Sequence, residues 1–171
     1  AAAIGVPVIQ KRVTWDTYEQ KFKEAITELK AKGVEGVVTG DIDLPEGKEW
    51  NDRISSEMGI KFIAPLWENE PEQILNDFVG AGFEAVVVCV KAETLAERWI
   101  GRKVDSDFID ELCQSNGSKI HPCGELGEYH TLVIDGSIFR KRIEILDSKP
   151  VFREGYWFLD ISRYELKLKR R

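Results

Sequence analysis

Apolar residues in the first part of the chain follow helical spacing and then strand spacing. Aromatic and aliphatic side chains from Trp15 to Leu29 recur on one helical face, and Gly33 follows where such a helix would end. We expect this aromatic face to lie in the core. The valine-rich stretch 34–39 comes next and is typical of a strand buried on both faces. A strand directly after a helix predicts a βαβ unit with a parallel sheet.

Two more helix–strand pairs continue the pattern. A helix is predicted over 45–58, where a proline begins it and Gly59 follows its end, and a short strand is predicted over 60–63. A further helix begins at Pro71 and precedes the run 83–90, which is the most strand-like stretch of the chain. Three repetitions of helix and strand predict an α/β fold.

The pattern changes in the second half. A helix is predicted over 106–114, but strand and turn signals dominate from Tyr129 onward. Polar and apolar residues alternate strictly over 164–169, which is typical of a strand with one solvent-exposed face. We therefore divide the chain into a parallel-sheet α/β domain over 1–91 and a smaller α+β domain over 92–171. Exposed strands near the C-terminus are also able to pair across a homo-oligomer.

The charge balance and the cysteines narrow the class of protein. The chain carries 24 Lys and Arg against 30 Asp and Glu, a net charge of −6, so no overall basic field attracts nucleic acid or an anionic membrane. No apolar run has the length of a membrane helix, and the start lacks the pattern of a signal peptide. Three widely spaced cysteines argue against a disulfide framework and for a reducing compartment. We therefore expect a cytoplasmic protein without nucleic-acid or membrane partners.

The richest candidate chemistry lies in the stretch 123–131, Cys-Gly-Glu-Leu-Gly-Glu-Tyr-His-Thr. Glycine lets the backbone turn through positive φ, so each Gly-Glu pair can present a carboxylate from a tight bend. Glu125 and Glu128 are close enough in sequence to share one cation such as Mg²⁺, or to supply a general base. The alternative is a simple turn with exposed acids.

One histidine lies directly beyond this bend on a predicted strand. If Tyr129 packs inward, the period of two turns His130 to the opposite face and Thr131 back again. A histidine beside two carboxylates suits a base, an imidazolium partner or a hydrogen-bond donor to substrate. A histidine with a purely structural role is the alternative.

Polar residues also follow the first predicted strand. Gly40 and Asp41 come just past its carboxyl end, where parallel sheets bind ligands, so we expect them to contact a nucleotide. The alternative is that Asp41 or Asp43 caps the next helix. Later in the chain Arg102 follows a glycine, and its guanidinium suits a phosphate or a carboxylate, unless it forms a salt bridge at the rim. The chain contains no GxxxxGK[ST] or GxGxxG motif, so it has no phosphate loop of its own.

Four short motifs in order resemble those of a known family. They are Val-Thr-Gly-Asp-Ile at 38–42, Pro-Leu-Trp at 65–67, Trp-Ile-Gly-Arg at 99–102 and Cys-Gly-Glu-Leu-Gly-Glu-Tyr-His-Thr-Leu-Val at 123–133. Together they resemble the ATP-binding N-type PP-loop family that includes diphthine–ammonia ligase. The resemblance covers nearly the whole chain.

The resemblance implies an adenine-nucleotide hydrolase-like domain followed by a family-specific C-terminal domain. It also implies ATP-dependent formation of an amide, in which a carboxylate is adenylated with release of pyrophosphate and is then attacked by ammonia or an amine. ATP and Mg²⁺ are the expected cofactors, with Gly40 and Asp41 near the nucleotide. Glu125, Glu128 and His130 are expected to face the acceptor substrate or Mg²⁺. Further substrate contacts are expected at Gly124, Gly127, Tyr129, Thr131, Arg102 and Trp67.

Two features depart from the family pattern. Members of the family begin with a strand and a Ser-Gly-Gly-Lys-Asp-Ser loop, whereas the opening of this chain resembles the part of the fold that follows. We therefore expect an N-terminally incomplete domain, and a poor catalyst when the chain acts alone. A non-catalytic nucleotide-binding or interaction domain is the alternative function.

The second departure concerns the substrate. Diphthine-type members carry Gly-Glu-Gly-Gly-Glu-Tyr-Glu-Thr where this chain has Leu126 and His130 at two of the positions. This change resembles the other branch of the family, which is associated with cobalamin-related metabolism. Loss of a carboxylate weakens the attraction for a cation such as the trimethylammonium group of diphthine.

Overall fold

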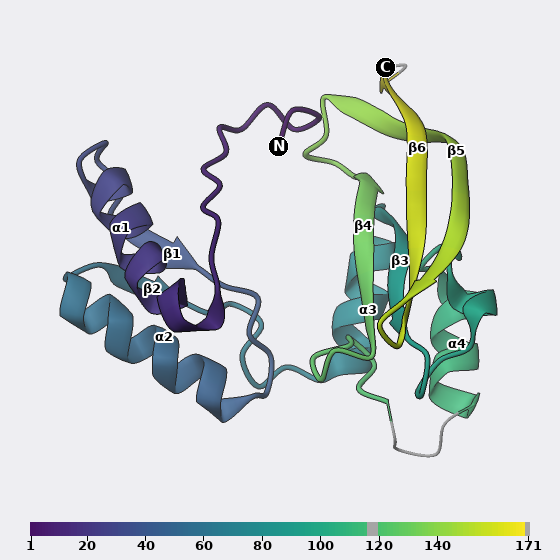
Figure 1. Ribbon diagram of the computed structural model, residues 1–171, viewed down its shortest axis with the longest axis horizontal. Coiled ribbons are helices and arrows are strands. Elements are labelled where there is room, and N and C mark those ends of the chain that lie inside the picture. Colours follow the sequence, from purple (N-terminus) through teal and green to yellow (C-terminus); the bar gives the residue numbers. More distant parts are fainter. Residues whose placement is uncertain (116–119, 170–171) are drawn as a thin grey trace. The chain divides into compact units, whose positions relative to one another are not determined.

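The computed structural model describes residues 1–115 and 120–169, and the chain folds into two compact units (Figure 1). The N-terminal unit comprises Pro7–Asn69. The C-terminal unit comprises Glu70–Arg171 together with Ala1–Val6. No helix within the described residues is long and apolar enough to cross a membrane.

The N-terminal unit is built from helices around a short parallel pair of strands. Its elements are the 3₁₀ helix η1 (Trp15–Thr17), α1 (Tyr18–Lys30), β1 (Gly36–Val38), α2 (Pro45–Met58) and β2 (Lys61–Ile63). β1 and β2 pair in parallel, which confirms the parallel arrangement predicted from the helix–strand pattern. α2 ends, as expected, at a glycine with left-handed backbone, because a residue without Cβ adopts this conformation at little cost.

The buried residues of this unit are mostly isoleucines. Ile26, Ile42, Ile54 and Ile60 are buried, and the rings of Phe22 and Trp50 pack edge to face between α1 and α2. The prediction that the whole aromatic face lies in the core is wrong at its start. Trp15, which lies in η1, is 94% exposed, and Tyr18, the first residue of α1, is 41% exposed.

The C-terminal unit has one antiparallel sheet and two helices. Its elements are α3 (Pro71–Gly80), β3 (Glu84–Lys91), the 3₁₀ helix η2 (Glu97–Trp99), α4 (Ser106–Ser115), β4 (Tyr129–Asp135), β5 (Lys141–Arg153) and β6 (Tyr156–Leu168). The strand order is β4-β3-β6-β5, and all neighbours are antiparallel. β5 and β6 form a long hairpin whose turn places Glu154 and Gly155 at positive φ, as a tight two-residue hairpin turn requires.

β3 differs from its prediction. The helix–strand repetition predicts a third parallel strand, but β3 pairs with the later strands β4 and β6, and both pairings are antiparallel. The division of the chain therefore lies between residues 69 and 70 and not at residue 91. An apolar run fits a buried strand of either sheet type, so its own residues do not reveal its neighbours.

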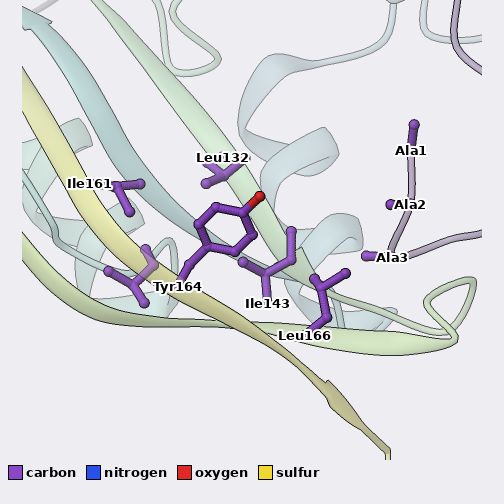
Figure 2. A pocket seen from close by; sticks show the side chains of 9 residues that line it. Ala1, Ala2, Ala3, Leu132, Ile143, Ile161, Tyr164 and Leu166 are labelled. Carbon is purple, nitrogen blue, oxygen red and sulfur yellow. The ribbon is translucent and has the colours of Figure 1, made fainter.

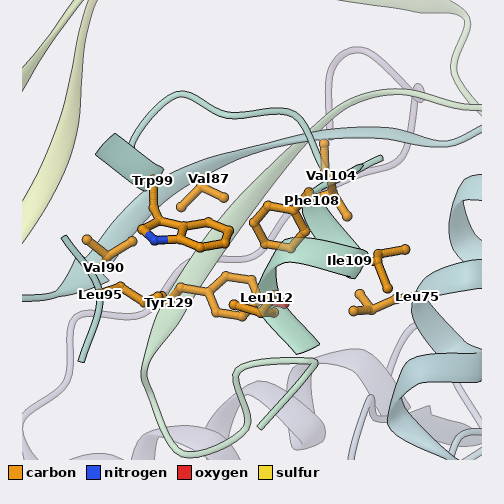
Figure 3. Packing of buried hydrophobic residues seen from close by; sticks show 11 residues of the cluster. Leu75, Val87, Val90, Leu95, Trp99, Val104, Phe108, Ile109, Leu112 and Tyr129 are labelled. Carbon is orange, nitrogen blue, oxygen red and sulfur yellow. The ribbon is translucent and has the colours of Figure 1, made fainter. Parts of the chain in front are cut away.

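The core of the C-terminal unit lies between its sheet and its two helices (Figure 3). Trp99, Phe108 and Tyr129 form a row of rings that meet edge to face. Leu75 of α3, Ile109 and Leu112 of α4 and several strand residues complete the buried cluster. Both helices therefore pack on the same face of the sheet.

A separate apolar cavity of about 380 Å³ lies on the sheet (Figure 2). Side chains of β4, β5 and β6 line it, among them Leu132, Ile143 and Tyr164, and the first three alanines form one wall. The carbonyl of Ala3 holds this wall in place, because it accepts hydrogen bonds from the backbone amides of Arg140 and Lys141 at 2.9 and 3.1 Å.

Candidate functional site

The glycine–glutamate segment forms a loop of consecutive turns before β4. It spans residues 121–128 and is called the 121–128 loop below. The amide of Gly124 donates to the carbonyl of His121 at 2.8 Å. The amide of Gly127 donates in turn to the carbonyl of Gly124 at 3.0 Å. Both glycines have positive φ, +72° and +79°, as their role in tight bends predicts. At Gly124 a side chain would also collide with the carbonyl of Tyr129, 2.7 Å from the Cβ position.

Glu128 turns its carboxylate into this loop. The residue is only 4% exposed. Its Oε1 accepts a hydrogen bond from the amide of His121 at 2.7 Å, and its Oε2 accepts one from the amide of Leu126 at 3.1 Å. Its own carbonyl accepts a third hydrogen bond from the amide of Lys91 on β3 at 2.9 Å. Backbone amides therefore stabilise the buried charge, and the charge in turn holds the loop closed against the sheet.

His121 organises the other side of the loop. Its Nδ1 accepts hydrogen bonds from the amides of Cys123 and Glu125, at 3.1 and 3.4 Å. Its position beside a proline carries no signal of the role, because the contact depends on how the loop folds back on itself.

Tyr129 anchors the start of β4. Its ring is buried 5.7 Å from the ring of Phe108, and its hydroxyl donates to the carbonyl of Pro122. Burial raises the pKa of the Tyr129 phenol above its ordinary value, so the group remains a neutral donor.

The next two residues face outward. His130 is exposed, as the alternation from an inward Tyr129 predicts. Thr131 is exposed as well, which differs from the prediction that it turns back inward. A β-bulge on β3, between Val87 and Cys89, lies opposite these residues, and strict alternation across the pair is interrupted there.

A cavity of about 370 Å³ opens where the loop meets β4. The structure brings most of the predicted acceptor-side residues around it, and the lining consists of Cys123, Gly124, Glu125, Gly127, Tyr129, His130 and Thr131. Glu128 is not part of this lining. The cavity thus combines a carboxylate, an imidazole and a hydroxyl with glycines that let a ligand approach the backbone.

The two glutamates of the loop lie in different surroundings, because Glu125 lines the cavity and Glu128 turns its carboxylate into the loop. Both carboxylate oxygens of Glu128 accept hydrogen bonds from backbone amides. Within residues 1–115 and 120–169, no group of three or more His, Cys, Asp or Glu side chains is placed to hold a metal ion. The arrangement favours a role for Glu128 in shaping the loop.

Arg102 has partners within its own unit. Its guanidinium lies 4.7 Å from the ring centre of Trp99 and forms an ion pair with Glu111 of α4. Arg98 pairs with the second oxygen of the same glutamate at 3.1 Å. The salt bridge considered as the alternative for Arg102 is thus present, and the contact with Trp99 connects it to the core.

The second cluster of predicted site residues lies in the N-terminal unit, at the carboxyl end of β1. Asp41 accepts hydrogen bonds from the hydroxyl of Thr39 at 2.6 Å and from the side-chain amide of Asn51 at 2.9 Å. Gly40, between Thr39 and Asp41, is exposed. The N-cap residue of α2 is Leu44, and the two hydrogen bonds to Oδ2 of Asp41 come from Thr39 and Asn51.

Trp67 follows the neighbouring strand β2. The two segments after β1 and β2 are joined, because the amide of Glu68 donates to the carbonyl of Ile42 at 2.7 Å. The ammonium group of Lys48 lies 5.5 Å from the ring centre of Trp67. Trp67 and Asp41 therefore belong to the same edge of the parallel pair, the edge at which such sheets bind ligands.

Comparison with known proteins places both units in one family. The diphthamide synthase N-terminal domain matches residues 1–62, and the diphthamide synthase C-terminal domain matches residues 70–167. The gap between the two matches contains the boundary between the structural units.

Several relatives of this chain share the name diphthine–ammonia ligase. A diphthine–ammonia ligase of Schizosaccharomyces pombe is 34% identical over 119 residues, which is 69% of this chain and 20% of that protein. The diphthine–ammonia ligase of Bos taurus is 29% identical over 121 residues, 69% of this chain and 44% of that protein. The Homo sapiens protein is 29% identical over 132 residues, 75% of this chain and 49% of that protein.

The chain thus spans between a fifth and half of the length of these relatives. The C-terminal domain match alone covers more than half of the chain, and the N-terminal match accounts for most of the remainder. By these matches, the chain belongs to the diphthamide synthase family.

Proposed function

We propose that this chain provides part of an ATP-dependent amide ligase. A carboxylate oxygen of the acid attacks the α-phosphorus of ATP, and pyrophosphate leaves. The nitrogen of ammonia or an amine then attacks the acyl carbon, AMP leaves and the nitrogen loses a proton. The observation that carries this proposal is the family membership of both units, together with relatives that are named diphthine–ammonia ligase.

The nucleotide side of the reaction is assigned to the N-terminal unit. Gly40 and Asp41 support this assignment because they follow β1, and Trp67 follows β2 at the same edge of a parallel pair. Exposed backbone at Gly40 lets a ligand approach closely, and the aromatic ring of Trp67 offers an apolar surface to a base.

The acceptor side is assigned to the cavity at the 121–128 loop. Glu125 and His130 line it and supply groups that can hold an amine and take up a proton as the amide forms. Thr131 adds a hydroxyl to the lining. Glu128 contributes by holding the loop in this shape.

Two classes of acid follow from these observations. Diphthine is the first candidate, because the relatives carry its name. His130 supports the second class, the cobalamin-related acids of the other branch, because an imidazole attracts a trimethylammonium group less than a carboxylate does. A comparison of turnover with the two acids separates these classes.

The proposal is tested by release of pyrophosphate when a full-length protein, which contains this chain together with the phosphate loop of the family, is supplied with ATP, ammonia and each acid. We expect Glu128→Gln to lower turnover by at least about tenfold, because the loop that carries Glu125 loses one of its two carboxylate contacts. Glu165→Gln is the matched control, since Glu165 lies exposed on β6, and its turnover should equal that of the wild type.

Normal turnover of Glu128→Gln would exclude Glu128 from the mechanism. Binding of AMP and ATP without release of pyrophosphate, with either acid, would instead favour a non-catalytic nucleotide-binding domain.

A further inference from the structure

Asp41 is held on one side by two separate elements. Its Oδ2 accepts two hydrogen bonds, from the hydroxyl of Thr39 at 2.6 Å and from the side-chain amide of Asn51 at 2.9 Å. The same Nδ2 of Asn51 also donates to the carbonyl of Gly47 at 3.0 Å. Since an amide nitrogen has two hydrogens, both donors of Asn51 are used, and its orientation is determined.

Gly47 makes room for the other oxygen of this carboxylate. A Cβ at Gly47 would lie 3.3 Å from Oδ1 of Asp41, which is tighter than ordinary van der Waals contact. Gly47 lies inside α2, where glycine is unfavourable relative to alanine. The close approach of Asp41 gives a physical reason for a glycine at this position.

The arrangement leaves one oxygen of Asp41 as an acceptor. Within the described part of the chain both side-chain hydrogen bonds to Asp41 end on Oδ2, and Asp41 is only partly buried. An ionised carboxylate has no donor, so Oδ1 attracts hydroxyl and amino groups and repels phosphate oxygens. The nucleoside part of a nucleotide carries such donors in its ribose hydroxyls and in the amino group of adenine.

We propose that Thr39 and Asn51 are positioning residues, which hold Asp41 so that its Oδ1 accepts a hydrogen bond from the nucleoside part of the nucleotide. The inference rests on the proposed function, because it takes Asp41 as part of the nucleotide site. It goes beyond that function in two ways. It names two residues that act through Asp41, and it states that Asp41 contacts the nucleoside end of the nucleotide.

Titration calorimetry of the whole chain with adenosine and AMP tests the inference. Asn51→Ala and Thr39→Val should each weaken binding of both ligands by about tenfold, equivalent to about 1.4 kcal/mol. Thr39→Ser, which keeps the hydroxyl, should bind adenosine like the wild type.

A double-mutant cycle separates positioning from a direct contact. If Asn51 acts only through Asp41, Asn51→Ala should have no further effect on adenosine binding in the Asp41→Ala background. Asn76→Ala is the matched control, because the amide of Asn76 donates to the carbonyl of Glu72 at 3.0 Å, one turn back in α3, as Asn51 does in α2. Thermal unfolding of each variant shows whether the fold is retained.

Two results would overturn the inference. The first is adenosine binding that is unchanged in Asn51→Ala and Thr39→Val. The second is a loss of adenosine binding on Asn51→Ala that is as large in the Asp41→Ala background as in the wild type. In each case the wild type still binds nucleotide, so the proposed function survives. A wild-type chain that binds neither adenosine, AMP nor ATP would overturn the proposed function and this inference with it.

Discussion

The buried carboxylate of Glu128 shows how a single residue shapes the candidate site. Two backbone amides, from His121 and Leu126, stabilise its charge, and the turn between them carries Glu125 to the lining of the cavity. Removal of one partner from a buried charged hydrogen bond is costly, so the loop depends on this side chain. Glu128 is thus not an exposed acid on a simple turn, because its carboxylate holds the 121–128 loop together.

The two loop glycines allow a matched test of this geometry. Gly127→Ala should lower the free energy of unfolding by about 1–2 kcal/mol, the cost of placing a residue with a Cβ at positive φ. Gly124→Ala should cost more, because its Cβ would also lie 2.7 Å from the carbonyl of Tyr129. Denaturant unfolding of the C-terminal unit measures both. Equal losses in the two variants would contradict the collision at Gly124.

At the level of elements, an ion cluster connects three strands of the antiparallel sheet. Arg142 of β5 donates to both carboxylate oxygens of Glu84 on β3, at 2.7 and 2.8 Å, and approaches Asp135 of β4 to 3.5 Å. Lys169 contacts the other oxygen of Asp135 at 2.8 Å. β5 is a neighbour of neither β3 nor β4 in the sheet, so Arg142 connects β5 to two strands with which it shares no backbone hydrogen bonds.

This cluster predicts a pH dependence of stability. The bond from Arg142 lowers the pKa of Glu84, so the folded state binds this proton less readily than the unfolded chain does. The stabilisation is complete above the ordinary pKa of a glutamate, about 4.3. It is lost as the pH falls through the lower pKa of the folded state.

We therefore expect Glu84→Gln to be less stable than the wild type near neutral pH, by less than about 1 kcal/mol because the pair is half-exposed. The difference should narrow as the pH falls below about 4. Urea unfolding of both proteins over this range measures it, and about 1 M salt should shrink it at neutral pH. A difference that stays constant down to low pH would show that the ion pair contributes nothing.

At the scale of the whole molecule, each of the two units has buried residues of its own. The C-terminal unit is organised around Phe108, which is fully buried between the rings of Trp99 and Tyr129. The N-terminal unit buries Ile54 completely. The two family matches follow this division except for residues 1–6, which lie in the N-terminal match and in the C-terminal unit.

Substitutions in each core should therefore act mainly on their own unit. Phe108→Ala should cost about 3–5 kcal/mol and Ile54→Ala about 2–5 kcal/mol, the range for large-to-small changes in a core. Hydrogen exchange measured by mass spectrometry should show faster exchange in α4, β3 and β4 for the first variant. It should show faster exchange in α1 and α2 for the second. Uniform acceleration along the whole chain in both variants would mean that the units unfold together.

Local features of the fold were determined by the sequence alone. Helices α1 to α4 lie close to where helical spacing, proline and glycine place them, because these signals act within a few residues. For the same reason the positive φ of Gly124 and Gly127 and the inward Tyr129 followed by an outward His130 were predictable.

Only the tertiary structure decided what depends on distant partners. Residues of β3 pair with residues of β6 more than sixty positions later, and an apolar run does not encode that neighbour, so the third strand was assigned to the wrong sheet. The same reason applies to the site. Whether Glu128 faces a ligand or the loop amides, and whether Asp41 caps a helix or is held by Asn51, follows from how separated segments meet, which spacing along the chain does not record.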